Sequence, residues 1–410
     1  MKFGPIHVIR DGTFRTLHGV HDLWQKLSGE IAAAARGGNA LAELVLDQTH
    51  GLLHSPLSAR FAEPALPTDD PGDLAAAARV IAAYKTAQAD AAAPPTASMW
   101  DRIGAEKQQF LTDLAKGAVP AVAAALAKMF VNDLTWGLGQ VHSGHPELLK
   151  SPQPTHLHFR FTDTLVNLAE AIGAIAVTSM AQNAAEHLKP LDRDLAETYD
   201  ATQRRLGFDP GFPTVGAAYG FRVAGRLVTI DSLTHAYTAY RARQLASVAN
   251  PTVYEIGGGY GCLALMARRA GVGPYAIFDL PWVNALQGYF LIRSLPAGSV
   301  RLYGEATGDV RVLPYWKLDD EPAKSCDVLV NTDSLPEMGR ATAAAYLPKI
   351  RRVVRGSFLS INQEAGAYVP GVGAQNNVRE LVDEMGGFTV RSRQRAWMRQ
   401  GYVEEVFEPR

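Results

Sequence analysis

The segment VYEIGGGYG, at positions 253–261, joins a short apolar run to a carboxylate and a glycine-rich turn. A second apolar run, YAIFDLP at 275–281, ends in Asp279, which follows Glu255 by 24 positions. Glycines allow a backbone to approach a ligand closely, and an acid at the end of the next strand can bind two ribose hydroxyls. Together the two segments predict a nucleotide-type cofactor site on a parallel sheet.

The glycine spacing separates two classes of cofactor. Gly257, Gly259 and Gly261 read GxGxG, whereas the dinucleotide fingerprint GxGxxG would place its third glycine at Cys262. An NAD-dependent oxidoreductase is therefore disfavoured. The pattern E-x-G-x-G-x-G resembles motif I of the class I S-adenosylmethionine-dependent methyltransferases.

This resemblance implies that the glycine turn faces the methionine part and ribose of S-adenosylmethionine, and that Asp279 binds the ribose hydroxyls. The adenine would lie against the segment after the third strand, for which Gly304, Glu305 and the residues at 314–316 are candidates. The residues expected to bind the cofactor are Glu255, Gly257, Gly258, Gly259, Gly261, Asp279, Leu280 and Asn331.

A second cluster of polar residues follows the apolar run of CDVLVNTDSLPEM, at 326–338. Ligands bind at the carboxyl ends of strands in open α/β sheets, so these groups would face the position of methyl transfer. Asp333 and Glu337 are four residues apart and share a face if a helix begins there. Alternatively, Asp333 or Ser334 caps the helix that carries Ala341 to Ile350.

Transfer of a methyl group to an alcohol benefits from a general base. Glu337, Asp333 and His235 are the candidate catalytic residues. A divalent cation is compatible with the sequence but not demanded by any motif. If one takes part, Asp333 and Glu337 are the expected ligands, because hard cations prefer oxygen. Zinc binding is disfavoured for the four histidines that flank a proline-rich segment, His142, His145, His156 and His158.

A third polar segment, SINQEAGAYVPGVGAQNN at 360–377, is rich in amide side chains. Asn362 and Gln363 stand at the end of a predicted strand and could hydrogen-bond a polyol. For Asn376 and Asn377, an ordinary amide-rich loop is the preferred interpretation.

Strand and helix patterns alternate from Pro251 onward, which predicts a doubly wound, Rossmann-like α/β methyltransferase sheet. The last two strands are separated only by AWMRQG, which favours a closing antiparallel hairpin. The predicted strands are 252–256, 275–279, 300–304, 310–313, 327–332, 357–362, 388–393 and 403–407.

The first half of the chain is alanine-rich and has apolar residues at helical spacing. We expect a helical N-terminal domain at 1–207 that closes the active site, dimerises or binds substrate. An adaptor hairpin and helix would occupy 208–250, and the methyltransferase domain 251–410. Asp73 is the expected cap of one N-terminal helix, and Asp231 or Ser232 that of the adaptor helix.

EIGGGYG, FDLP and NTDSLPEM together resemble the sugar O-methyltransferase family from about Thr214 onward. GGGYG and FDLP are shared with plant-type and hydroxyindole O-methyltransferases, which carry a catalytic histidine after the fourth strand. This chain has Asp333 to Glu337 there and no histidine. The resemblance therefore implies O-methylation of a sugar or glycosylated metabolite. The alternatives are transfer to nitrogen, carbon or a phenol, and a non-catalytic cofactor-binding protein.

The composition of the chain limits the kinds of partner that it is expected to bind. The 410 residues carry a net charge of −1, so the chain lacks the basic character typical of nucleic-acid or anionic-membrane binding. The longest apolar stretch, 165–181, carries Asn167 and Glu170 and is too short for a usual membrane span, which favours a buried helix. Two cysteines and no signal-peptide pattern predict a cytoplasmic protein, and alanine-rich helices favour a homodimer. The expected partner is a small-molecule acceptor.

Overall fold

The computed structural model describes residues 60–62, 70–91, 99–139, 155–177, 194–364, 366, 368–369, 373–399 and 401–410. Apolar residues at helical spacing predict helices at 17–37 and 38–54, and both ranges lie outside the described residues, as do His142 and His145. None of the described helices has the length and apolarity that crossing a bilayer requires.

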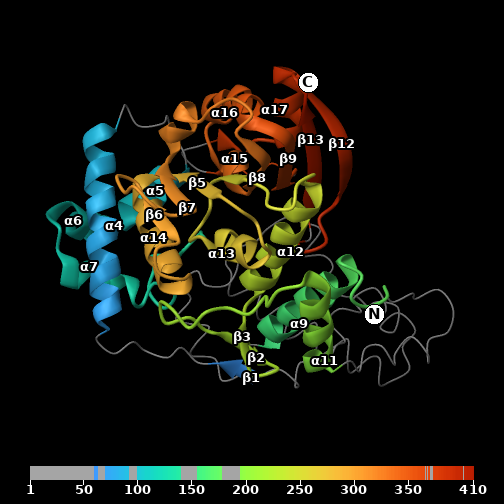
Figure 1. The fold of residues 1–410 in the computed structure, drawn as a ribbon, viewed down its shortest axis with the longest axis horizontal. Coiled ribbons are helices and arrows are strands. Elements are labelled where there is room, and N and C mark those ends of the chain that lie inside the picture. The colour runs from blue at the N-terminus through green and yellow to red at the C-terminus, as the bar shows by residue number, and fades with distance from the viewer. Residues whose placement is uncertain are drawn as a thin grey trace, which may run out of the picture.

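An eight-stranded sheet occupies the C-terminal half of the described chain, in the order β12–β13–β9–β8–β4–β5–β7–β6 (Figure 1). Neighbouring strands pair in parallel across the part of the sheet that runs β9–β8–β4–β5–β7–β6. Strand β13 is antiparallel to both β9 and β12. This order and closing hairpin confirm the predicted Rossmann-like methyltransferase fold. The strands are β4 (Val253–Ile256), β5 (Tyr275–Asp279), β6 (Val300–Leu302), β7 (Val310–Pro314), β8 (Cys326–Thr332), β9 (Val354–Gln363), β12 (Phe388–Arg395) and β13 (Tyr402–Pro409).

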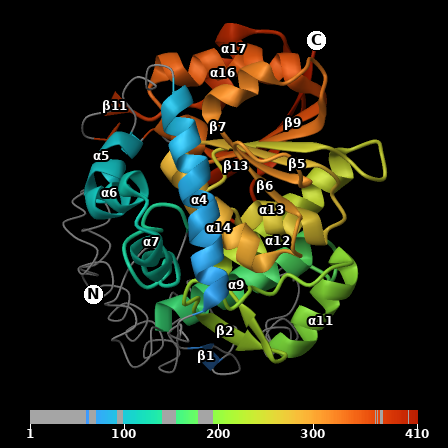
Figure 2. The same cartoon turned by 60° about the vertical axis from the view of Figure 1, so that its left-hand side comes forward.

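Helices cover both faces of this sheet (Figure 2). Successive residues of β4 alternate between the two faces: Tyr254 and Ile256 belong to one apolar core, and Val253 belongs to the other. A parallel sheet that is buried on both faces needs such double-sided packing. One face carries α16 (Arg340–Val353) and α17 (Val378–Met385), and the other carries α12 (Ile230–Leu245), α13 (Cys262–Arg269) and α14 (Pro281–Ser294).

The N-terminal helices pack on the sheet domain through α4 (Pro71–Asp90), which lies along α14 (Figures 1 and 2). The prediction that Asp73 caps this helix is wrong, because Pro71 begins it and Asp70 accepts the capping bond from Gly72 N at 2.7 Å. Asp73 instead accepts from the Tyr289 hydroxyl at 2.8 Å. The helices that follow are α5 (Met99–Glu106), α6 (Gln108–Lys116) and α7 (Val119–Leu126).

A smaller group of helices and strands precedes β4 in the chain. The predicted adaptor hairpin is present, and its second strand leads into α12. Thr229 caps α12 in a capping box with Ser232, so the expectation that Asp231 or Ser232 is the cap is wrong. The helix predicted at 165–181 begins earlier and ends at Ala171, shortly before Gly173 at φ +70°. This group contains α9 (Thr155–Ala171), α11 (Leu195–Leu206), β1 (Arg60–Ala62), β2 (Gly220–Val223) and β3 (Arg226–Val228).

Candidate functional site

A cavity of about 190 Å³ lies at the carboxyl ends of β4, β5 and β8. Glu255, Asp279 and Thr332 line it where these three strands end. The N-terminal half contributes Trp100 and the segment 137–139 to the opposite wall. Segments far apart in the chain therefore meet at the edge where open α/β sheets bind ligands.

The glycine turn after β4 is closely packed, and two positions require glycine. Gly257 has φ +73°, and a Cβ there would lie 2.2 Å from Ser334 Cβ. Gly259 has φ +52°, and a Cβ there would lie 2.8 Å from the Leu138 carbonyl oxygen. Side chains at these positions would be strained and would also displace a neighbour. All four predicted glycines belong to this turn, and Gly257, Gly258 and Gly259 line the cavity.

Asp279 is fixed in place before any ligand arrives. One carboxylate oxygen accepts from Gly258 N at 2.9 Å and from Gln287 Nε2 at 2.7 Å, and the other accepts from Leu280 N at 2.8 Å. Burial raises the Asp279 pKa to about 6, against the lowering effect of these hydrogen bonds. The side chain is therefore ionised at neutral pH, with lone pairs left for further donors. Both Asp279 and Leu280 line the cavity.

Glu255 lies deeper in the same wall and is 2% exposed. Its Oε2 accepts from the Tyr275 hydroxyl at 2.8 Å. Burial, with a smaller contribution from the charge of Asp279, raises the Glu255 pKa to about 8. Glu255 is thus mostly protonated at neutral pH, whereas Asp279 is ionised.

Asn331, predicted to bind the cofactor, does not line the cavity. It is fully buried and donates to the Ile256 carbonyl at 2.9 Å and to the Ser334 hydroxyl. Asn362, predicted to bind a polyol, is also buried: it donates to Asn331 Oδ1 at 3.1 Å and accepts from Asp333 N at 2.7 Å. These amides form a network that joins the end of β4 to the backbone of Asp333.

Asp333 has φ +67°, an uncommon conformation for an aspartate. It precedes the short helix α15 (Ser334–Glu337) but makes no capping hydrogen bond, and α16 begins only at Arg340. The capping alternative is therefore wrong for Asp333. Its carboxylate pairs with Arg399, whose guanidinium carbon lies 4.0 Å from the centroid of the Tyr402 ring. The strained backbone places the carboxylate on the cavity wall.

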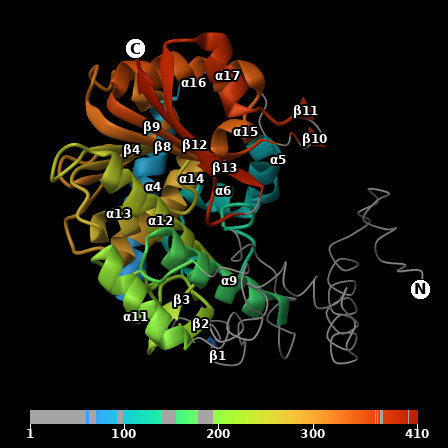
Figure 3. The same cartoon turned by 90° about the vertical axis from the view of Figure 1, so that its right-hand side faces the viewer.

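Glu337 also faces the cavity, four residues after Asp333. Its Oε2 accepts from Trp100 Nε1 at 3.1 Å. This hydrogen bond joins α15 to α5, whose ribbons lie next to each other in Figure 3. The Trp100 ring packs against Trp282 with centroids 6.2 Å apart. Burial and the nearby charge of Asp333 raise the Glu337 pKa to about 8, so this side chain is mostly protonated at neutral pH.

His235 faces the cavity from α12. Its Nδ1 is buried without a hydrogen-bond partner among the described residues. Burial lowers the His235 pKa below 6.5, although the charges of Asp231 and Asp333 act in the opposite direction. The imidazole is therefore neutral at neutral pH and able to accept a proton. Of the three candidate bases, Asp333 is paired with Arg399 and Glu337 is mostly protonated. His235 is uncharged and can accept a proton.

The predicted metal ligands do not fit a divalent cation. Arg399 already pairs with Asp333, and Trp100 donates to Glu337. Among the described residues, no three histidine, cysteine, aspartate or glutamate side chains form a group that could hold a metal ion. The side chains of His156 and His158, like those of His142 and His145, lie outside that description.

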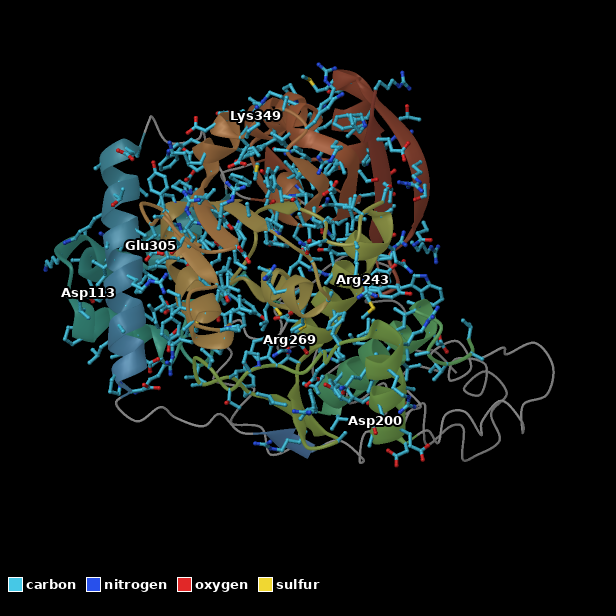
Figure 4. The ribbon with its side chains drawn as sticks, in the orientation of Figure 1. Asp113, Asp200, Arg243, Arg269, Glu305 and Lys349 are labelled. Atoms are coloured by element: carbon cyan, nitrogen blue, oxygen red, sulfur yellow. The ribbon has the colours of Figure 1, made fainter. Side chains whose placement is uncertain are left out.

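Of the segments considered for the adenine, only one reaches the cavity. Glu305, labelled in Figure 4, faces α4 and pairs with Arg79 at 2.7 Å. Tyr315, which follows β7 in a 3₁₀ turn (Tyr315–Asp320), lines the cavity instead.

The amide-rich segment after β9 has structural roles in the described residues. Gln363 hydrogen-bonds Gln375, Asn376 donates to the Met338 carbonyl at 2.6 Å, and Asn377 caps α17. The loop interpretation preferred for Asn376 and Asn377 agrees with these contacts.

Comparisons with known proteins give a distant likeness of fold. No family model and no curated protein matches the chain. A 1,6-didemethyltoxoflavin-N1-methyltransferase from Burkholderia thailandensis, solved with S-adenosylhomocysteine, is 15% identical at a TM-score of 0.31, covering 43% of this chain and 76% of that chain. The magnesium protoporphyrin IX methyltransferase from Synechocystis PCC 6803, solved with S-adenosylmethionine, is 14% identical at a TM-score of 0.32, and the match covers 44% of this chain and 81% of that chain. A ribosomal protein L11 methylase from Lactobacillus delbrueckii subsp. bulgaricus is 14% identical at a TM-score of 0.29, and the match covers 42% of this chain and 77% of that chain.

Proposed function

We propose that this chain transfers a methyl group from S-adenosylmethionine to a hydroxyl of a sugar or of a glycosylated small molecule. The observation that carries the proposal is one cavity lined by two chemically different groups of residues. We take the glycine turn and Asp279 as its cofactor end, and neutral His235 with Asp333 and Glu337 as its acceptor end.

The residues at the first end fit the cofactor. The Asp279 carboxylate, held by two backbone N–H groups, would accept the two ribose hydroxyls. Gly257, Gly258 and Gly259 line the cavity and would present their backbone to the amino-acid tail, and Tyr315 would flank the adenine. Three aspartates, Asp231, Asp279 and Asp333, and one guanidinium, that of Arg399, line the described part of the wall, and this acidic excess suits a cationic sulfonium.

The second end supplies the proton chemistry. Bound S-adenosylmethionine would provide an activated methyl carbon on a sulfonium sulfur. His235 would accept the proton of the acceptor hydroxyl as the oxygen–carbon bond forms and the carbon–sulfur bond breaks. The nearby charges of Asp231 and Asp333, which favour a protonated His235, would then stabilise the imidazolium. Trp100 and residues 137–139 would cover the site and hold the acceptor in line.

A hydroxyl-rich acceptor suits the polar groups of the second end. Protonated Glu337 can donate and accept, Arg399 donates, and the Tyr402 hydroxyl can do both. A polyol offers the same mixture of donors and acceptors within a few ångströms. A purely apolar acceptor would leave the remaining donors and acceptors of these groups without partners, which is costly in a buried site.

The test is methyl transfer from radiolabelled S-adenosylmethionine to a panel of sugars, glycosides, amines and phenols. Label in a sugar hydroxyl, located by mass spectrometry, supports the proposal. Label only on nitrogen, carbon or a phenol would refute the acceptor class and retain the methyltransferase. Cofactor binding without turnover on any acceptor would indicate a non-catalytic protein, and tight binding of NAD in its place would indicate an oxidoreductase.

Replacing Glu337 by Gln tests whether Glu337 or His235 is the general base. Because the Glu337 pKa is about 8, the side chain is mostly uncharged at pH 7, and Gln mimics this state. We expect Glu337→Gln to retain kcat/KM within about tenfold at pH 7. Above pH 8, wild-type activity should fall as Glu337 ionises beside Asp333, and the variant should lack this decline. A wild-type rate that rises through pH 8 and is lost in the variant would instead make Glu337 the base.

A further inference from the structure

Asp231 is a cavity residue that neither motif includes. It is 1% exposed and stands in the first turn of α12. Thr229, and not Asp231, caps that helix. The Asp231 carboxylate lies in the cavity wall. Its Oδ2 accepts from the Tyr260 hydroxyl at 3.0 Å.

The carboxylate lies between the glycine turn and the segment that covers it. Tyr260 belongs to the turn itself. A Cβ added to Gly139 would lie 2.5 Å from Asp231 Oδ2, so this oxygen is against the backbone of the covering segment. Asp231 therefore lies beside Tyr260 and Gly139, whereas Asp279 contacts Gly258.

The surroundings favour a negative charge on Asp231. The Tyr260 hydroxyl donates to it, and the positive end of the α12 dipole lies at the same turn. A buried carboxylate beside a ligand cavity is stabilised most by a cationic partner that also hydrogen-bonds to it. The bound cofactor carries such a group, the α-ammonium of its amino-acid tail.

We propose that Asp231 binds the α-ammonium of S-adenosylmethionine, while Asp279 holds the ribose. This inference rests on the proposed function, because it needs that cofactor in this cavity. Glu255 is the competing carboxylate. Its pKa near 8 leaves it mostly uncharged at neutral pH, so it is less suited to an ammonium partner.

The experiment compares two probes by calorimetry on the full chain. S-Adenosylhomocysteine carries the ammonium, and 5′-methylthioadenosine keeps the nucleoside but lacks the amino-acid tail. We expect Asp231→Asn to weaken S-adenosylhomocysteine tenfold or more and to leave 5′-methylthioadenosine within about twofold. Asp279→Asn is the matched control and should weaken both probes alike, since both carry the ribose.

Each other outcome is decisive. An equal loss of both probes in Asp231→Asn, or a selective loss in Glu255→Gln alone, would overturn the assignment. Retained binding of 5′-methylthioadenosine shows that the variant is folded. If the variant does not fold, the wild type must bind a deaminated analogue of S-adenosylhomocysteine at least tenfold more weakly than the parent compound. A wild type that binds no S-adenosylhomocysteine would refute the proposed function itself.

Discussion

Replacing His235 by Gln is expected to lower kcat by about 10²- to 10⁴-fold, the usual contribution of a general base. Gln keeps a polar side chain of similar size but cannot accept a proton at neutral pH. Affinity for S-adenosylhomocysteine, measured by calorimetry, should change by no more than about twofold, because His235 is assigned to the acceptor end. A loss in kcat without a loss of cofactor binding is therefore the expected signature.

The pH profile makes this prediction sharper. Burial lowers the His235 pKa below 6.5, so the neutral base is present above that pKa and lost as pH falls through it. On the acid side, with S-adenosylmethionine saturating, wild-type kcat should decline only below pH 6.5, and the residual kcat of His235→Gln should lack that decline. Gln244→Ala, on the exposed last turn of the same helix, is the matched control and should leave kcat unchanged. A His235→Gln protein with normal turnover would remove the histidine from the mechanism.

The sheet was predictable from the sequence because its central strands are buried on both faces. Such strands appear as short apolar runs separated by helical segments, and all eight runs in the sequence correspond to strands of the sheet. Helix starts were predicted less well. Asp70, Asp73, Asp231 and Ser232 are all chemically suitable caps, and only the path of the chain decides among them.

The acceptor end was harder to predict, although topology contained one unused signal. If β13 is antiparallel to β9, the turn before β13 must lie at the carboxyl edge of β9, beside the cofactor site. The segment AWMRQG is that turn, and it brings Met398 and Arg399 to the cavity. Trp100 and Leu138 gave no comparable signal, since they reach the cavity only through packing of the N-terminal half.

The choice among candidate bases depended on burial, which residue spacing does not report. Asp333 and Glu337 share a face as their spacing predicts, and both line the cavity. However, one pairs with Arg399 and the other is buried enough to stay protonated near pH 7. His235 looked like an ordinary helix histidine in the sequence. Its unpartnered Nδ1 on the cavity wall distinguishes it among the described residues.

Replacing Asp279 by Asn is expected to weaken S-adenosylhomocysteine roughly 10- to 100-fold, with hydrogen bonds to a charged group worth about 1.5–3 kcal/mol. The native carboxylate accepts from three donors: Gly258 N, Leu280 N and Gln287 Nε2. Asn has one acceptor oxygen and an added NH₂ group, so at least one donor would face another donor. The substitution therefore disturbs the glycine turn as well as the ribose site.

The pH dependence of S-adenosylhomocysteine binding gives an independent test of Asp279. Because the Asp279 pKa is about 6, wild-type affinity for S-adenosylhomocysteine should fall as pH drops through 6, while Asp279→Asn should show no such change. Asp327→Asn is the matched control: Asp327 is also buried and accepts from Thr252 N at 2.9 Å, but at the amino end of the strands. It should lower the unfolding temperature and leave affinity unchanged. Equal affinity losses in both variants would mean that Asp279 acts through fold stability, not through the ribose.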